Sequence, residues 1–177
     1  MGSWIVEHDA ALYLYYIGWN TGVSVPFRNA IGLAISSDGG QTFTRYSEGP
    51  ILDRSIHDPC FVASSCVLIE EGKWRMWYLS GLRWEMGSDQ PKPYYHIKYA
   101  ESTDGTRWER SGLVCIDFKS ADEHAISRPC VFKESGVYQM WYSYRGARYR
   151  IGYAESEDGI HWERKDEEAG IDVSASG

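Results

Sequence analysis

The feature that most constrains this chain is an internal sequence repeat. One segment reads IGLAISSDGGQTF at 31–43, a second reads IKYAESTDGTRW at 97–108, and a third reads IGYAESEDGIHW at 151–162. Recurrence at such intervals is the signature of a repeat architecture, in which every copy is one supersecondary unit that packs against its neighbours. The sequence therefore predicts three related units.

Two further segments accompany each copy of the repeat. An aromatic-rich stretch precedes it, reading LYLYYIGW at 12–19, KWRMWYLS at 73–80 and VYQMWYSY at 137–144. A short segment that closes on an aspartate follows it. The closing residues are Asp53, Asp117 and Asp172. Segments that recur in one fixed order indicate that the units share one topology.

Each unit has the pattern of four antiparallel β-strands, here lettered A to D. Aromatic and β-branched residues dominate the repeated stretches, as is typical of strands. The Asp-Gly in each copy predicts a hairpin turn between strands C and D, in which Gly39, Gly105 and Gly159 supply the positive φ. The predicted strands are 3–8, 12–19, 30–37 and 42–46; 59–69, 73–80, 95–102 and 107–110; and 129–134, 137–144, 149–156 and 161–164.

The length of the repeat decides how the units are arranged. Propeller blades have four strands and roughly 40–50 residues, and the turn aspartates Asp38, Asp104 and Asp158 are 66 and 54 residues apart, which leaves room for long loops. A β-sandwich does not normally repeat its sequence from one strand quartet to the next. We therefore predict an all-β fold, a β-propeller of three four-stranded antiparallel blades in a single domain. The blades span about 3–53, 58–117 and 128–172 of residues 1–177.

Composition narrows the range of partners. Aromatic residues make up 15% of the chain, which suits both strands and the stacking of flat rings on sugars. A net charge of −7 without a basic stripe argues against nucleic acid, and no segment approaches the roughly 20 apolar residues of a membrane span. The start lacks the basic region of a signal peptide, and the 4 Cys have no metal-ligand spacing. We predict no metal, no cofactor, and four buried thiols in a reducing, cytoplasmic compartment.

The two ends of a blade differ in their loops. The tight C–D turns mark one end, whereas the B–C loops 19–29 and 81–94 and the D–A linkers 47–58 and 111–128 fall at the other. Function concentrates in loops that a rigid scaffold holds. We therefore expect the functional site at the loop-rich end.

The second and third units share one more segment, HDPCFV at 57–62 and SRPCVF at 127–132. This alignment treats the Pro-Cys pair as scaffold and makes Asp58 and Arg128 equivalent. Because the innermost strand of a blade begins beside the central funnel, we expect both side chains to point into it.

Across the whole chain, the order DP in strand A, MWY in B and YAES-DG-W over C and D resembles the five-bladed propeller glycosidases. These include the invertase/levansucrase, arabinanase/xylosidase and mannoside phosphorylase families, and the sequence is most similar to an uncharacterised invertase-like branch. The resemblance implies a carbohydrate-active protein with two aspartates and a glutamate in a funnel. It covers three blades rather than five, which implies an incomplete catalytic site.

By this resemblance, Asp58 matches the aspartate that orients and tunes, and Glu123 is the candidate general acid, with Asp122 as its alternative. One carboxyl group must protonate the leaving oxygen while another acts at the anomeric carbon. Each also has a structural interpretation: Asp58 could cap a turn before Pro59, and Glu123 could be a solvated linker carboxylate.

Further candidates are aromatic platforms for sugar rings and side chains that could bind hydroxyls or phosphate. The substrate-binding candidates are Trp19, Arg28, His57, Trp84, His124, Arg128 and Arg145. The sequence leaves open a glycoside hydrolase, a phosphorylase, a non-catalytic carbohydrate-binding module, and a structural propeller fragment that closes its ring as a homodimer.

Overall fold

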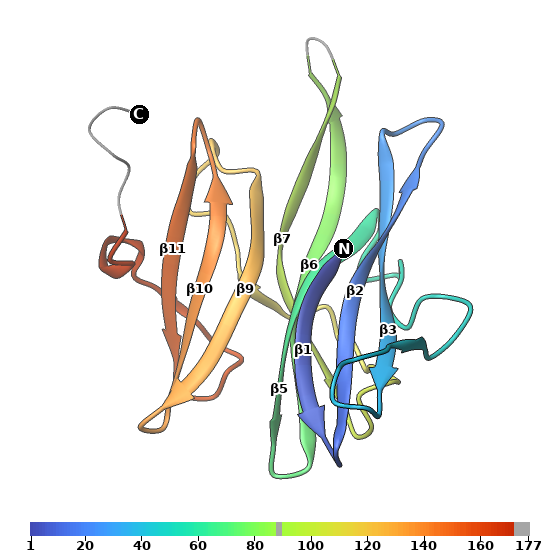
Figure 1. Ribbon diagram of the computed structural model, residues 1–177. Coiled ribbons are helices and arrows are strands. Elements are labelled where there is room, and N and C mark those ends of the chain that lie inside the picture. The colour runs from blue at the N-terminus through green and yellow to red at the C-terminus, as the bar shows by residue number, and fades with distance from the viewer. Residues whose placement is uncertain (88–89, 172–177) are drawn as a thin grey trace.

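The computed structural model describes residues 1–87 and 90–171, and their regular secondary structure is almost entirely β-strand (Figure 1). The strands are β1 (Gly2–His8), β2 (Ala11–Thr21), β3 (Phe27–Ser36), β4 (Thr44–Arg45), β5 (Phe61–Glu70), β6 (Lys73–Met86), β7 (Pro91–Ser102), β8 (Val114–Ile116), β9 (Ala125–Glu134), β10 (Val137–Arg145), β11 (Tyr149–Ser156) and β12 (Glu163–Arg164). A single 3-10 turn, η1 (Asp166–Glu168), follows. Within the described ranges, no helix has the length and apolar character needed to cross a membrane.

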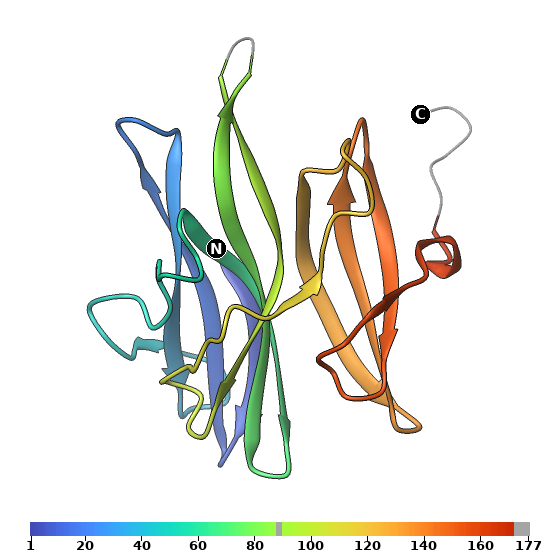
Figure 2. The ribbon, with the colours of Figure 1, turned by 180° about the vertical axis from the view of Figure 1, so that it is seen from behind.

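The strands form antiparallel groups that stand side by side (Figures 1 and 2). β1 to β4 make one sheet in chain order, β5 to β7 pair in chain order with β8 against β7, and β9 to β12 again pair in chain order. The prediction of an all-β fold is confirmed. Asp172, predicted to close the third unit, lies outside the described residues.

One residue pair links the second and third strand groups. Tyr95 of β7 and Ala125 of β9 form one parallel pair, and the backbone N–H of Tyr95 donates to the carbonyl of His124 at 3.0 Å. This link joins β5 to β12 into one eight-stranded sheet. It arises because β9 begins before residue 129, its predicted start, so the end of the linker pairs with β7.

The predicted B–C loops 19–29 and 81–94 are mostly strand. The β2–β3 and β6–β7 ladders continue through them, and Trp84, for example, pairs with Pro93. The β6–β7 hairpin consequently reaches beyond its neighbours (Figure 1). Most of the side chains that were expected on these loops, including Trp19 and Trp84, therefore lie on paired strands.

The Asp-Gly turns have the predicted backbone. Gly39, Gly105 and Gly159 have φ of +72°, +72° and +75°, values that residues with a side chain rarely adopt. In each turn the serine hydroxyl of the Ala-x-Ser segment donates to the turn aspartate, at 2.7 to 3.1 Å. The turn is thus fixed by side chains that recur in every copy.

The predicted fourth strand of the second unit, 107–110, is wrong. The Asp104 carboxylate accepts the backbone N–H groups of Thr106 and Arg107 at 2.7 and 2.9 Å, so the turn extends to residue 107. Only Glu109 then forms an isolated bridge to β7, and the paired strand β8 comes later in the chain.

One contact between neighbouring groups occurs twice. The Tyr15 hydroxyl on β2 donates to the carbonyl of Gly105 at 2.9 Å, and Trp77 Nε1 on β6 donates to the carbonyl of Gly159 at 2.8 Å. Both rings are fully buried. An aromatic ring on the second strand of one unit therefore fixes the turn of the next, and both rings belong to the core.

The predicted alignment of the two Pro-Cys pairs is also wrong. Cys66 pairs with Trp77 and Cys130 pairs with Trp141, so these two cysteines are the equivalent ones. Cys66 and Cys115 are buried, but Cys130 is exposed, which corrects the expectation that all four thiols are buried.

The corrected register changes the position of Arg128. Its counterpart is Ser64, and both residues have positive φ, +54° and +37°, beside a shift in the strand register. Arg128 is exposed on this bulge, whereas Asp58 is buried before β5. The two residues are therefore not equivalent, and they do not share one environment.

Candidate functional site

Hairpins from all three strand groups meet around a cavity of about 620 Å³ at the end where the sequence predicts functional loops. β2–β3, β6–β7 and β10–β11 each contribute one wall. The aromatic and basic side chains that line it are Trp19, Phe27, Lys92, Tyr95, His124, Arg145 and Tyr149. Because every wall belongs to a paired hairpin, the cavity is preformed.

Four of the predicted binding residues gather at this cavity. Trp19, His124 and Arg145 line it, and Trp84 packs behind it, with its ring 4.9 Å from that of Phe27. Trp19 is 60% exposed, and its ring lies 4.6 Å from the ring of Phe27. This support leaves Trp19 with a rigid, open aromatic surface.

The other three predicted binding residues lie elsewhere. Arg28 and Arg128 are exposed, outside the described lining of the cavity. His57 is half-buried in the first linker beside Gly112, where an added Cβ would come within 2.7 Å of His57 Nδ1. The structure does not bring these three residues together.

Asp58 lies in the linker before β5 and is fully buried. Its carboxylate accepts hydrogen bonds from Arg110 at 2.8 Å, from the Ser55 hydroxyl at 2.9 Å and from the Tyr78 hydroxyl at 3.1 Å. Lys98 Nζ lies 3.9 Å from Oδ1 of Asp58. Both carboxylate oxygens are thus engaged by protein donors.

Glu123 lies in the linker before β9 and is 8% exposed. Arg164 binds both of its oxygens, at 2.7 and 3.1 Å, in the two-pronged geometry that guanidinium and carboxylate groups favour. The backbone N–H of Lys119 donates to Glu123 at 2.9 Å. Arg164 also binds Asp166 at 2.9 Å, whereas Asp122, the alternative acid, is exposed.

Asp58 and Glu123 occupy equivalent places in the repeat. Each ends a tight turn closed by a backbone hydrogen bond of 3.2 Å, and each is bound by an arginine two residues after a repeat tryptophan, Arg110 or Arg164. Each arginine also donates to the carbonyl of the closing aspartate of the preceding unit, at 2.6 and 2.7 Å. The arrangement supplies both carboxylates with a structural role, and their catalytic role stays a prediction.

Lys98 is a buried charge that the sequence interpretation missed. It stands where the other two copies have Gly32 and Gly152, and it is 5% exposed. Its ammonium group donates to the carbonyl of His57. Burial lowers the pKa of Lys98, while the charge of Asp58 opposes that shift. A lysine at a position that is glycine in both other copies departs visibly from the repeat, and that signal could have found it.

His96 precedes Lys98 on the same face of β7 and is 4% exposed. Its Nδ1 lies 3.0 Å from the Asp117 carboxylate, and its Nε2 has no hydrogen-bond partner in the described part of the chain. Burial lowers the pKa of His96, and Asp117 partly offsets the shift. The second strand group therefore buries two basic side chains, His96 and Lys98, on β7.

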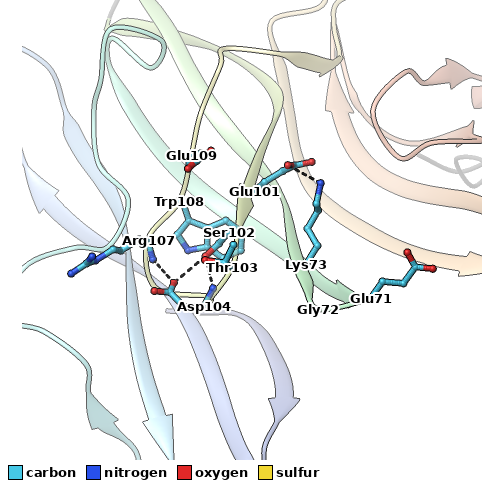
Figure 3. Close-up of a pocket in the computed structure, with 10 residues that line it drawn as sticks. All are labelled: Glu71, Gly72, Lys73, Glu101, Ser102, Thr103, Asp104, Arg107, Trp108 and Glu109. Atoms are coloured by element: carbon cyan, nitrogen blue, oxygen red, sulfur yellow. Dashed lines mark hydrogen bonds and ion pairs between the residues drawn. The ribbon is translucent and has the colours of Figure 1, made fainter.

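A second cavity, of about 540 Å³, lies at the opposite, tight-turn end of the second group (Figure 3). Lys73 and Glu101 on its wall pair with each other at 3.1 Å, and Asp104 is bound by its own turn. A hollow of the same make-up recurs in the third group around Glu155 and Lys165, which are 2.6 Å apart. Because a similar hollow recurs in the third group, we assign it to the scaffold.

Comparison with known sequences identifies close relatives. No protein-family model matches the chain. Two uncharacterised proteins, one from each of two strains of Mycobacterium tuberculosis, are 44% and 43% identical to it over 174 residues. The alignments cover 98% of this chain and 57% of each relative, so the chain spans little more than half the length of the curated relatives it matches.

Solved structures show which fold the chain shares. A β-fructofuranosidase from Bombyx mori has a TM-score of 0.72 at 19% identity, covering 91% of this chain and 35% of its own. A family 117 glycoside hydrolase from Zobellia galactanivorans has a TM-score of 0.72 at 17% identity, with coverages of 95% and 55%. A sucrose-6-phosphate hydrolase from Lactobacillus gasseri has a TM-score of 0.70 at 20% identity, with coverages of 93% and 33%.

These structures are β-propeller glycoside hydrolases. The chain therefore has the fold of part of a β-propeller of the glycosidase type, as the sequence resemblance implied. At these identities the likeness concerns the fold alone, and function has to be argued from the site.

Proposed function

We propose that this chain is the carbohydrate-recognising part of a glycosidase-like propeller, built from three four-stranded blades, and that it does not cleave glycosides by itself. The observation that carries the proposal is the cavity formed by three hairpins, with Trp19 and Tyr149 each 60% exposed at its walls. Exposed flat rings on rigid supports suit the apolar faces of sugars.

The absence of cleavage follows from the two candidate carboxylates. A glycosidase needs one carboxyl group free to donate a proton and a second that acts at the anomeric carbon. Asp58 and Glu123 are instead bound by Arg110 and Arg164 and lie outside the described lining of the cavity. The free thiols of the chain support the proposal that it works in a reducing, cytoplasmic compartment.

Tryptophan fluorescence and calorimetry with a panel of neutral and acidic oligosaccharides test the proposal. We expect one sugar class to bind and Trp19→Ala to weaken its binding roughly tenfold, the order of magnitude of one aromatic contact. Tyr46→Ala is the matched control, because Tyr46 is an exposed ring outside the cavity lining. Hydrolysis of aryl glycosides that disappears in Glu123→Gln would show that the chain is catalytic and would overturn the proposal.

A second candidate function is a structural one, in which two copies associate and close a ring. Exposed apolar side chains of the third group favour it, because Phe132 on β9 and Ile151 on β11 expose 41% and 37% of their surface and apolar patches mark association sites. Light scattering decides this candidate. A dimer that Phe132→Glu dissociates supports it, and a monomer at all concentrations rejects it.

A further inference from the structure

We propose that the cavity at the hairpin end binds an anionic carbohydrate, meaning a sugar that carries a carboxylate or a phosphate group. This inference rests on the proposed function and adds the charge of the ligand to it. The anion would lie against Lys92 and Arg145, and the sugar ring against the aromatic walls.

The charge of the cavity differs from that of the chain. The whole chain has 25 acidic residues against 18 Lys and Arg. Among the described residues that line the cavity, the titratable side chains other than tyrosine are Lys92, His124 and Arg145, and none is acidic. Basic side chains concentrated at the wall of a low-dielectric cleft attract anions, even in a protein of net negative charge.

The two permanent cations at the cavity lie against aromatic rings, and Lys92 also faces Glu85 across the β6–β7 ladder. The Arg145 guanidinium lies 4.8 Å from the centre of the Tyr149 ring, and Lys92 Nζ lies 5.3 Å from that of Tyr94. Neither forms an ion pair with any carboxylate of the described residues, in contrast to Arg164. Cations placed on rings keep most of their N–H donors for a ligand.

His124 reports the same positive potential. It is 7% exposed, and burial lowers its pKa, with the charges of Lys92 and Arg145 lowering it further. Its Nδ1 lies 3.5 Å from the carbonyl of Asp122, so the ring is held at the cavity wall. Only the part of this shift that comes from Lys92 and Arg145 points to an anion, because burial by itself disfavours a charge of either sign.

Calorimetry with four probes tests the inference. The probes are a trimer of galacturonic acid, the matched neutral trimer of galactose, glucose 6-phosphate and inorganic phosphate. We expect at least one anionic sugar to bind roughly tenfold or more tightly than the neutral trimer, since charge-assisted hydrogen bonds are the stronger class. Its affinity should fall as salt is raised from about 0.01 to 0.15 M. The uronate and phosphate probes show which anion the cavity prefers.

Matched variants locate the effect. Arg145→Gln and Lys92→Gln should remove the preference for the anionic sugar, and Arg145→Lys should restore part of it. Arg148→Gln makes the same charge change in the same hairpin, on an exposed residue outside the described lining, and should keep the preference.

The outcomes separate the two proposals. If the neutral trimer binds as tightly as both the acidic trimer and glucose 6-phosphate, this inference is overturned and the proposed function stands. Inorganic phosphate that binds as tightly as glucose 6-phosphate, with no uronate binding, also overturns it, because the sugar ring then contributes nothing. Failure of every sugar to bind overturns both.

Discussion

In each of the two linkers between the strand groups, an arginine binds a buried carboxylate, Asp58 or Glu123. The other charged side chains around this contact differ between the two linkers. In the first linker, one carboxylate, Asp58, faces two cations, Arg110 at 2.8 Å and Lys98 at 3.9 Å. At the second linker, Glu123 shares the Arg164 guanidinium with Asp166 of η1, which Lys119 also contacts at 3.1 Å. The first carboxylate therefore has two cations to itself, whereas the second shares its arginine with another carboxylate.

One repeat position accounts for the difference. Lys98 on β7 corresponds to Gly152 on β11, where an added Cβ would come within 2.3 Å of the Tyr142 ring and 2.7 Å of the Asp166 carboxylate. The space that a lysine side chain occupies in one group is therefore filled by a carboxylate in the other. The comparison teaches that the repeat fixes the arginine and its turn, whereas one variable position sets the charge around them.

The largest expected effect is that of Asp58→Asn. The change leaves Arg110 and Lys98 without a counter-charge in a fully buried place, and breaking a buried pair costs about 3–5 kcal/mol. Urea unfolding followed by fluorescence measures this loss. Asp53→Asn in the same linker is the control, because Asp53 is exposed and should change stability by less than about 0.5 kcal/mol. Equal losses for the two variants would contradict the burial argument.

Glu123→Gln should destabilise the chain less, by about 1–3 kcal/mol, the usual range for a hydrogen bond to a charged group. Asp166 remains bound to Arg164 at 2.9 Å and keeps its charge balanced. The same unfolding measurement checks this. If Glu123→Gln costs as much as Asp58→Asn, the two linkers do not differ as described.

The third expected effect is a dependence on pH that comes from His96 of the second group. Burial lowers the pKa of His96, with Asp117, Lys98 and Asp58 as the charges around it, whereas an unfolded histidine titrates near about 6.5. As pH falls below about 6.5, the unfolded chain binds the proton first, so stability falls.

Unfolding free energies at pH values from about 7 to 5 measure the effect. The wild-type chain should lose more stability over this range than His96→Gln does. The equivalent positions are Ala30 and Arg150, so the first and third groups have no histidine there. Parallel profiles for the two proteins would refute the assignment to His96.

The smallest expected effect is that of Arg45→Ala. Arg45 stands two residues after Phe43, as Arg110 stands two residues after Trp108. It is therefore the first-group residue that corresponds to Arg110 and Arg164. It is exposed and has no carboxylate partner among the described residues, so stability should change by less than about 0.5 kcal/mol. A loss close to that of Arg164→Ala would reveal a partner for Arg45 and would extend the comparison to a third linker.

The sequence was informative wherever structure depends on neighbouring residues. It predicted the Asp-Gly turns, whose glycines have the expected positive φ, and the long strands of every group. It failed at the register of β9, because the bulges at Ser64 and Arg128 have no marker in the sequence. It also failed in the second unit, where β8 begins at Val114, beyond the predicted strand 107–110.

The candidate site was predicted in part. Trp19, His124 and Arg145 were singled out and do share a cavity, whereas Lys92 and Tyr149 were not singled out although they line it. The cavity is assembled from three hairpins that lie far apart in the chain. The distance along the sequence between its walls explains why no local pattern reveals the full set.

By itself the sequence determined the repeat, the all-β fold and the chemistry of the turns, because strand pairing and positive-φ turns depend on residues a few positions apart. Only the tertiary structure decided which charges meet. Arg110 binds Asp58 across 52 residues, and Arg164 binds Glu123 across 41. Such contacts depend on how one strand group packs against the next, and this packing places two candidate catalytic carboxylates in ion pairs and the basic and aromatic side chains around the cavity.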